Sequence, residues 1–287
     1  MITWIASYPK SGNTWVRSLL TDYISYPNEY SFKNLKKILQ FPSKKFFDYL
    51  FDENIVQESE DFKNLEIASK YWIPAQDRLI FEKKKDILLK THCAPMRIGN
   101  NFFLNKSTTK ATICIIRDPR QVVLSLKNYY DHKNINSSFD YMKNNHILEV
   151  GPKKNGKREI FTYAPLPNWG DYYLSWKMYE QQFPILFIKY EKLFEFNTFK
   201  IILNFLYEYL KNKDFMFDEN KAKVIYDRSS FLNLKNLEIN NGFDEKVSEN
   251  SFFKDGKINS WKNILTKEEI NMIEETFKNA MTKFNYI

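Results

Sequence analysis

Residues 4–15 decide the fold of this chain, and they read Trp4-Ile5-Ala6-Ser7-Tyr8-Pro9-Lys10-Ser11-Gly12-Asn13-Thr14-Trp15. This stretch begins with apolar residues, continues through a Lys-Ser-Gly turn and becomes apolar again. The order predicts a strand, a tight loop and a helix. Backbone N–H groups at the start of a helix are unpaired, and together they carry about half a positive charge. A phosphate placed there would also meet the hydroxyls of Ser11 and Thr14 and the ammonium of Lys10. The stretch therefore predicts an anion site.

The loop departs from the familiar ATP-binding pattern, in which a glycine comes first and a Gly-Lys-Ser/Thr tripeptide closes the loop. Here Lys10 precedes Gly12, and Ala6 or Ser7 stands near the position of the first glycine. This order weakens a kinase or ATPase interpretation without removing it. A plain connection is the structural alternative, since Ser, Gly and Asn are common turn residues.

Arg117 follows the apolar run 113–116, which reads as a strand, and Pro119 suits the first turn of a helix after it. Arg117 is therefore predicted at the carboxyl end of a strand, where open parallel sheets bind ligands. Its guanidinium can hold a phosphate through two charge-assisted hydrogen bonds. A pair between Arg117 and Asp118 is the structural alternative.

His92 comes just after a second predicted strand, and it lies two residues beyond Lys90. If the chain is still extended there, the two side chains point to the same side. An imidazole with an ordinary pKa of about 6.5 can accept a proton from an acceptor hydroxyl near neutral pH. Cys93 would point the other way, which disfavours a Cys-His nucleophile. A structural role is the alternative for a lone histidine.

With these segments the chain resembles the cytosolic-type sulfotransferases, which use 3′-phosphoadenosine 5′-phosphosulfate (PAPS). Residues 8–15 look like the phosphosulfate loop of the family, residues 117–125 resemble its 3′-phosphate motif, and residues 253–263 are similar to its third signature. Shorter matches follow in the family's order, namely Lys90-Thr91-His92, Trp169-Gly170-Asp171 with Trp176, Tyr190-Glu191 and Ser229-Ser230-Phe231. The resemblance covers nearly the whole chain except residues 25–86 and 131–165.

The resemblance implies in-line transfer of a sulfonate group from PAPS to a hydroxyl or amine of a small-molecule acceptor, with adenosine 3′,5′-bisphosphate (PAP) as product and no metal. It implies His92 as general base, with Lys10 and Lys90 as catalytic cations. The residues implied at the 5′-phosphate are Lys10, Ser11, Gly12, Asn13 and Thr14. Those implied at the adenine are Trp15, Tyr190, Ser229 and Phe231. Those implied at the 3′-phosphate are Arg117, Ser125, Lys254 and Gly256.

The third signature departs from the family pattern. Lys254-Asp255-Gly256 stands where Arg-Lys-Gly is usual, so the planar fork of an arginine is lost and a negative charge is added near a dianionic phosphate. We therefore expect Arg117, Ser125 and the amide of Gly256 to hold the 3′-phosphate. The change keeps open a non-catalytic nucleotide-binding module, beside a small-molecule or nucleotide kinase. Asn13 replaces a common threonine, and we expect little effect because backbone N–H groups do most of the phosphate binding.

Composition favours one α/β domain. The chain has 287 residues, 43% of them hydrophobic, and its seven glycines form no linker. Strand-like runs at 2–7, 87–90, 111–116 and 185–189 alternate with helical patterns at 198–210 and 267–283, which predicts a central parallel sheet with helices on both faces. The Asn- and Lys-rich segment Lys133–Lys157 is expected to be a loop or lid, or a solvated insertion.

The remaining expectations concern partners and location. The net charge of +8 is spread among mixed Lys, Glu and Asp, so we expect solvated faces and no nucleic-acid partner. Cys93 and Cys114 form no disulfide framework and fit a reducing cytoplasm. No apolar run of eighteen residues occurs, so no membrane span is expected. The aromatic-rich segments 25–86 and 131–176 are expected to supply the walls of an acceptor pocket, with core packing as the alternative for their Tyr and Phe residues.

Overall fold

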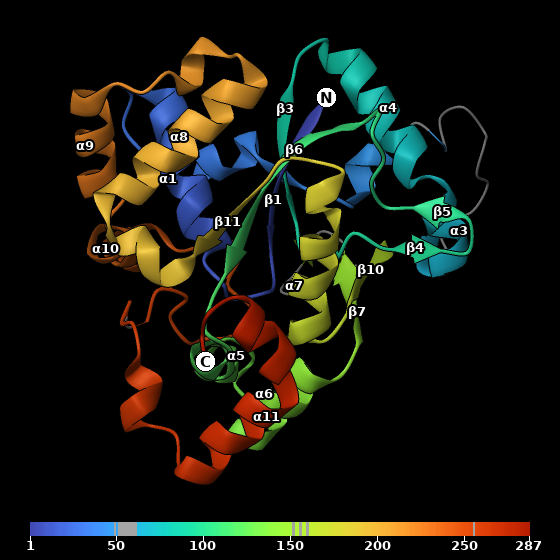
Figure 1. Ribbon diagram of the computed structural model, residues 1–287. Helices are drawn as coiled ribbons and strands as arrows, with labels where there is room; N and C mark the ends of the chain where they lie inside the picture. Colours follow the sequence, from blue (N-terminus) through green and yellow to red (C-terminus); the bar gives the residue numbers. More distant parts are fainter. Residues whose placement is uncertain (49, 51–61, 151–152, 155–156, 159–160, 255) are drawn as a thin grey trace.

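The computed structural model describes residues 1–48, 50, 62–150, 153–154, 157–158, 161–254 and 256–287. At its centre is a five-stranded parallel sheet with the strand order β11-β6-β1-β3-β2 (Figure 1). Its strands are β1 (Ile2–Ser7), β2 (Leu39–Gln40), β3 (Ile87–Thr91), β6 (Thr109–Ile116) and β11 (Ile185–Lys189). The predicted parallel sheet is thus confirmed, and each of the four predicted runs lies within an observed strand.

The strands are apolar on both faces because both faces are covered. Successive side chains of a strand point to opposite faces, so Trp4 and Ala6 of β1 enter one core while Ile5 between them enters the other. All three are fully buried. A parallel sheet whose strands are buried on both sides needs helices on each face, as the sequence predicts.

Four helices pack in the core around Ile5, on the left in Figure 1. They are α1 (Asn13–Ser25), α8 (Phe196–Leu210), α9 (Glu219–Arg228) and α10 (Phe231–Asn241). Leu19 and Leu20 of α1 and Leu203 and Leu206 of α8 are almost completely buried there. The helical pattern predicted at 198–210 lies within α8.

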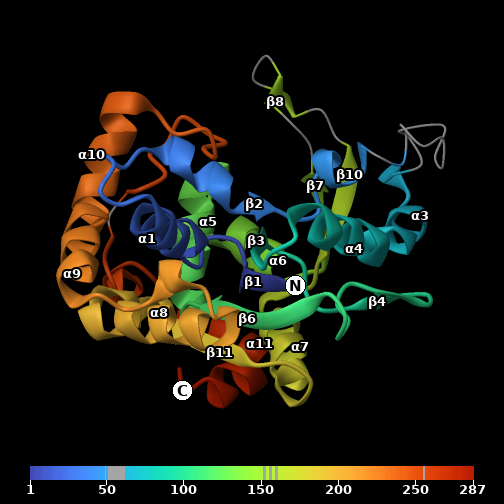
Figure 2. The ribbon, with the colours of Figure 1, turned by 90° about the horizontal axis from the view of Figure 1, so that it is seen from above.

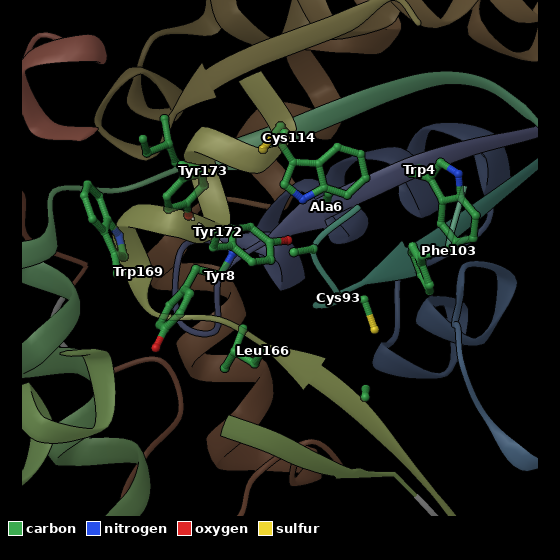
Figure 3. Packing of buried hydrophobic residues seen from close by; sticks show 14 of the residues in the cluster. Trp4, Ala6, Tyr8, Cys93, Phe103, Cys114, Leu166, Trp169, Tyr172 and Tyr173 are labelled. Carbon is green, nitrogen blue, oxygen red and sulfur yellow. Dashed lines mark hydrogen bonds between the residues drawn. The ribbon is translucent and has the colours of Figure 1, made fainter. Parts of the chain in front are cut away.

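The other core, around Trp4, holds most of the large aromatic side chains (Figure 3). The helices with described bounds in this core are α3 (Leu65–Lys70), α4 (Trp72–Lys83), α5 (Pro119–Tyr130), α6 (Ile135–Lys143), α7 (Trp169–Met178) and α11 (Lys267–Lys283). Trp169 and Trp176 of α7 are fully buried in this core. Figure 2 shows α3 and α4 at the opposite end of the molecule from α9 and α10.

The described part of Lys133–Lys157 forms a helix and strands, so the expectation of an irregular loop is wrong there, while a role as a lid stays a prediction. Asn134 caps α6 by accepting a hydrogen bond from the Ser137 amide, and Phe139 and Met142 anchor the helix in the core. Strand β7 (His146–Val150) then pairs antiparallel with β10 (Thr162–Leu166). Residues 151–152 and 155–156 lie outside the described residues.

The remaining elements are short. The other strands are β4 (Arg97–Ile98), β5 (Asn101–Phe102), β8 (Lys153–Lys154) and β9 (Lys157–Arg158). The 3₁₀ turns are η1 (Phe32–Lys37), η2 (Lys44–Phe46), η4 (Tyr179–Gln181), η5 (Tyr190–Phe194), η6 (Lys213–Phe215) and η7 (Ser260–Asn263). Within the described ranges, no helix is long and apolar enough to cross a membrane.

The carboxyl edge of the sheet gathers the residues that the sequence singled out. The loop after β1 carries Lys10, β3 is followed by His92, β6 by Arg117 and β11 by Tyr190. Because these strands are parallel neighbours, their carboxyl ends lie at one edge, which is where open α/β sheets bind ligands. Cys93 and Cys114 are buried free thiols.

Candidate functional site

A cavity of about 810 Å³ opens at this edge and continues into a second cavity of about 460 Å³. Arg117, Ser125, Tyr190, Phe231 and Phe252 line both. The other predicted residues that line the larger cavity are Lys10, Gly12, Asn13, Thr14, Trp15, Lys90 and His92. Lys254 and Gly256 line the smaller one. The structure therefore brings the side chains or backbone of almost all predicted site residues to one continuous space.

Hydrogen bonds from the protein interior hold the loop between β1 and α1 in place. Asn13 Nδ2 donates to the Ile5 carbonyl at 3.0 Å, and the Tyr173 hydroxyl lies 3.3 Å from the amide of Tyr8. No side chain of the described residues caps α1, so its first amides are left for a ligand. The Oδ1 atom of Asn13 is buried without a partner among these residues. The uncapped amides are typical of an anion site at a helix start, whereas this oxygen can only accept a hydrogen bond.

Lys10 is held by aromatic rings. Its backbone is left-handed, with φ of 65°, and its Nζ atom lies 3.4 Å from the ring centre of Phe252 and 4.2 Å from that of Tyr129. Burial, and then the neighbouring Arg117, lower the pKa of Lys10 well below its usual value. The aromatic faces attract the ammonium, and the carboxylates of Glu245 and Glu238 raise its pKa in part, against the effect of burial. Phe252 and Tyr129 were not predicted, because nothing in their local sequence marks them.

His92 has a defined tautomer. Its Nδ1 atom lies 2.7 Å from the Ser7 carbonyl oxygen, which can only accept, so Nδ1 carries the hydrogen and Nε2 is the basic nitrogen. Burial, and then the positive charge of Lys90, lower the pKa of His92 to about 3. The imidazole is therefore neutral near neutral pH, which is the form that a general base requires.

Arg117 faces the cavity and not its sequence neighbour. Its Nη1 donates to the Lys10 carbonyl at 2.9 Å, and its guanidinium lies 3.9 Å from the centre of the Tyr190 ring. Asp118 instead caps α5 and pairs with Arg120 at 2.7 Å. The alternative of an Arg117–Asp118 pair is therefore wrong.

Two predicted side chains do not reach the cavities. Ser11 and Ser229 are fully buried, and neither lines either cavity. The hydroxyl of Ser11 accepts from Tyr173 at 3.1 Å, and that of Ser229 donates to Asp22 at 3.2 Å. Asp22 is a fully buried carboxylate that needs donors, which explains the orientation of Ser229. The Ser229 carbonyl accepts from the Trp15 indole at 2.9 Å and so helps to fix that ring.

Glu245 is the main feature that sequence reasoning missed. Its Oε1 accepts from Arg17 Nη1 at 2.7 Å, and its Oε2 lies 3.2 Å from the Thr14 hydroxyl and 3.5 Å from Lys90 Nζ. Burial raises the pKa of Glu245, but Lys90 and Arg17 outweigh burial and hold it well below its usual value. An anionic side chain therefore lies among the cations of the cavity.

A family model described as "Sulfotransferase domain" matches residues 2–285. The chain belongs to this family. The sulfotransferase domain is also similar to the solved structure of mouse sulfotransferase SULT7A1 complexed with PAP, with 18% identity, a TM-score of 0.59, and coverage of 98% of this chain and 84% of that chain. It is also similar to the solved structure of retinol dehydratase in complex with androsterone and inactive cofactor PAP. The identity is 16%, the TM-score is 0.58, and the match covers 98% of this chain and 80% of that chain. At these identities the likeness shows the fold.

The aromatic-rich segments contribute little to the cavity of this sulfotransferase domain. Of the described residues in 25–86 only Lys36 and Gln40 line it, and of those in 131–176 only Leu148 and Glu149. Both segments thus contribute to the wall of the larger cavity, but with polar and aliphatic side chains, and their role at an acceptor stays a prediction. Their large rings, such as Phe41, pack in the core, where burial of apolar area stabilises the fold.

The third signature frames the smaller cavity of the sulfotransferase domain. Gly256 has φ of 58°, and a Cβ placed on it would lie 2.3 Å from the Phe231 ring. Only glycine lets the backbone approach the ring so closely. Asp255 lies outside the described residues, so its effect on a phosphate stays a prediction.

Gly12→Ala tests the close packing of the first loop. Gly12 has φ of 102°, and an added Cβ would lie 2.6 Å from Cδ2 of Tyr190. We expect urea unfolding to show a free energy of unfolding lower by about 1–3 kcal/mol. Gly99→Ala is the control, because Gly99 also has a positive φ but has open space around it. Equal losses in the two variants would show that contact with Tyr190 does not constrain the loop.

Proposed function

We propose that this domain transfers a sulfonate group from PAPS to a hydroxyl or amine of a small-molecule acceptor and releases PAP. The observation that carries the proposal is the convergence of Lys10, His92, Arg117 and Tyr190, each after a different strand, on one cavity beside an uncapped helix start. This arrangement offers positive charge for phosphates and a neutral imidazole for a proton.

The residues fit the donor at both ends. Gly12 and Gly256 let the backbone pack directly against the rings of Tyr190 and Phe231, which brings both loops to the walls of the cavities. The ammonium of Lys10 lies over aromatic rings at the cavity and forms no ion pair among the described residues, so a phosphate can reach it, although Glu245 and Glu238 act on its charge from a distance. These features support a nucleotide with a phosphate at each end.

PAPS supplies an activated sulfonate on a phosphate leaving group. The amides of residues 11–14 and the Thr14 hydroxyl would hold the 5′-phosphate, and Lys10 would stabilise its growing negative charge. Lys90 would bind the sulfonate oxygens. His92 Nε2 would accept the proton of the attacking group, while the Ser7 carbonyl keeps the ring oriented.

The 3′-phosphate and the adenine would bind further along the cavity. Arg117 and Ser125 line both cavities, with Lys254 and Gly256 behind them, and would hold the 3′-phosphate. Trp15 and Phe231, whose ring centres are 6.4 Å apart, would flank the adenine with Tyr190. Ser11 and Ser229 would contribute indirectly. Ser11 would support the backbone of the first loop, and the Ser229 carbonyl would hold the Trp15 ring in place. We place the reaction in the cytoplasm, since both cysteines are free thiols.

The experiment is a transfer assay with the purified protein, PAPS and acceptors from the classes of phenols, lipids, sugars, small alcohols and amines. We expect PAP release that depends on at least one class. A kinase would instead be stabilised against heat by ATP–Mg²⁺ and not by PAP. A non-catalytic module would bind PAP and transfer nothing. Either of these results would overturn the proposal.

A further inference from the structure

The carboxylate of Glu245 lies where the donor's own anionic group is expected. Its Oε2 atom is 3.2 Å from the Thr14 hydroxyl and 3.5 Å from Lys90 Nζ. Under the proposed function Thr14 contacts the 5′-phosphate and Lys90 contacts the sulfonate. One oxygen of Glu245 thus contacts both groups that would hold the two halves of the phosphosulfate.

Two anionic oxygens cannot share this position. A phosphate oxygen bound to the Thr14 hydroxyl, or a sulfonate oxygen bound to Lys90 Nζ, would come close to the Glu245 oxygen that already contacts both groups, and like charges at such a distance repel each other. Water screens the repulsion only in part, because the Glu245 side chain is 30% exposed while that of its partner Lys90 is only 9% exposed. Donor binding therefore requires Glu245 to leave Thr14 and Lys90.

The buried guanidinium of Arg17 explains why the carboxylate of Glu245 lies in this cavity. A nearly buried guanidinium needs a counter-charge, and Glu245 Oε1 supplies it at 2.7 Å. The Tyr129 hydroxyl donates to the Glu245 carbonyl at 3.0 Å, which fixes the backbone beside the site. The same chain segment continues to Phe252, whose ring faces Lys10. Glu245 thus ties this segment to α1 and β3.

We propose that Glu245 is a built-in competitor for the donor's phosphosulfate group and thereby sets donor affinity. The inference rests on the proposed function. Glu245 neutralises Arg17 and Lys90 while the cavity is empty, and the donor must displace its Oε2 to reach Thr14 and Lys90. PAP and PAPS therefore bind more weakly than the cations of the site alone would allow.

The test is the dissociation constant of PAP, measured by calorimetry for the wild-type protein and for Glu245→Gln. Glutamine keeps a hydrogen-bond acceptor for Arg17 but removes the negative charge. We expect Glu245→Gln to bind PAP about tenfold more tightly, since a charge-assisted contact no longer has to be broken. An unchanged or weaker affinity overturns the inference.

Asp244→Asn is the matched control. Asp244 is the neighbouring residue and lines the same cavity, but it is exposed and forms no ion pair among the described residues. We expect its PAP affinity to stay close to wild type. An equal gain in both variants would mean that net charge, and not the contact with Thr14 and Lys90, sets the affinity, and the inference would fail.

Two further measurements keep the test decisive. If Glu245→Gln does not fold, Glu245→Asp retains the charge for Arg17 but withdraws the carboxylate by one methylene, and tighter PAP binding is again expected.

Inorganic pyrophosphate is the second probe. If the wild-type protein does not bind PAP, the proposed function fails, while tighter pyrophosphate binding by Glu245→Gln still supports the competition and unchanged binding refutes it.

Discussion

His92→Ala lowers the rate of sulfonate transfer by about 10²–10⁴-fold and leaves PAP binding nearly unchanged. The reason is that Nδ1 is engaged by the Ser7 carbonyl, so Nε2 is the nitrogen that can accept a proton. The low pKa of this histidine keeps the ring neutral near neutral pH, so Nε2 carries no proton there. The check is kcat for PAPS-dependent transfer together with the dissociation constant of PAP.

His92→Asn separates catalysis from structure. The asparagine amide can still donate a hydrogen bond toward the Ser7 carbonyl, but it cannot act as a base. We therefore expect the same loss of rate as in His92→Ala, with an unchanged free energy of unfolding. If His92→Asn restored the rate, or if both variants lost PAP binding as much as rate, the assignment of a general base would be wrong.

Arg117→Ala removes the preference for PAP over adenosine 5′-monophosphate. A charge-assisted hydrogen bond contributes about 1.5–3 kcal/mol, so we expect PAP to bind about ten- to hundredfold more weakly. The monophosphate lacks the 3′-phosphate, and its affinity should change little. Calorimetry with both nucleotides measures the ratio directly.

The hydrogen bond from Arg117 to the Lys10 carbonyl makes a control necessary, because the variant could disturb the first loop. Ser125→Ala is the control, because it leaves the hydrogen bond from Arg117 to the Lys10 carbonyl in place. We expect it to weaken PAP binding by a smaller factor than Arg117→Ala. An equal loss for both nucleotides in Arg117→Ala would assign Arg117 to loop support and not to the 3′-phosphate.

The residues that could be predicted for the site are those that directly follow strands. Lys10, His92 and Arg117 each follow an apolar run, and the carboxyl ends of parallel strands share one edge of a sheet. Their convergence could therefore be expected from the sequence. The family resemblance added Phe231 and Gly256, whose close contact in the structure depends on the missing Cβ of glycine.

The unpredicted part depends on contacts between distant segments. Glu245 meets Lys90 across 155 positions of the chain, and no local pattern marks it. Ser229 matched a family position, yet its hydroxyl pairs with the buried Asp22, which only the packing of α1 against α9 reveals. The polar composition of Lys133–Lys157 conceals α6, because two buried residues, Phe139 and Met142, are enough to anchor this helix.

The most direct test of the account is the structure of the protein in complex with PAP. The account predicts the 5′-phosphate within hydrogen-bond distance of the Gly12 and Asn13 amides and the Thr14 hydroxyl, and the 3′-phosphate on the Arg117 guanidinium. PAP bound outside this cavity, or with neither phosphate at these groups, would contradict it.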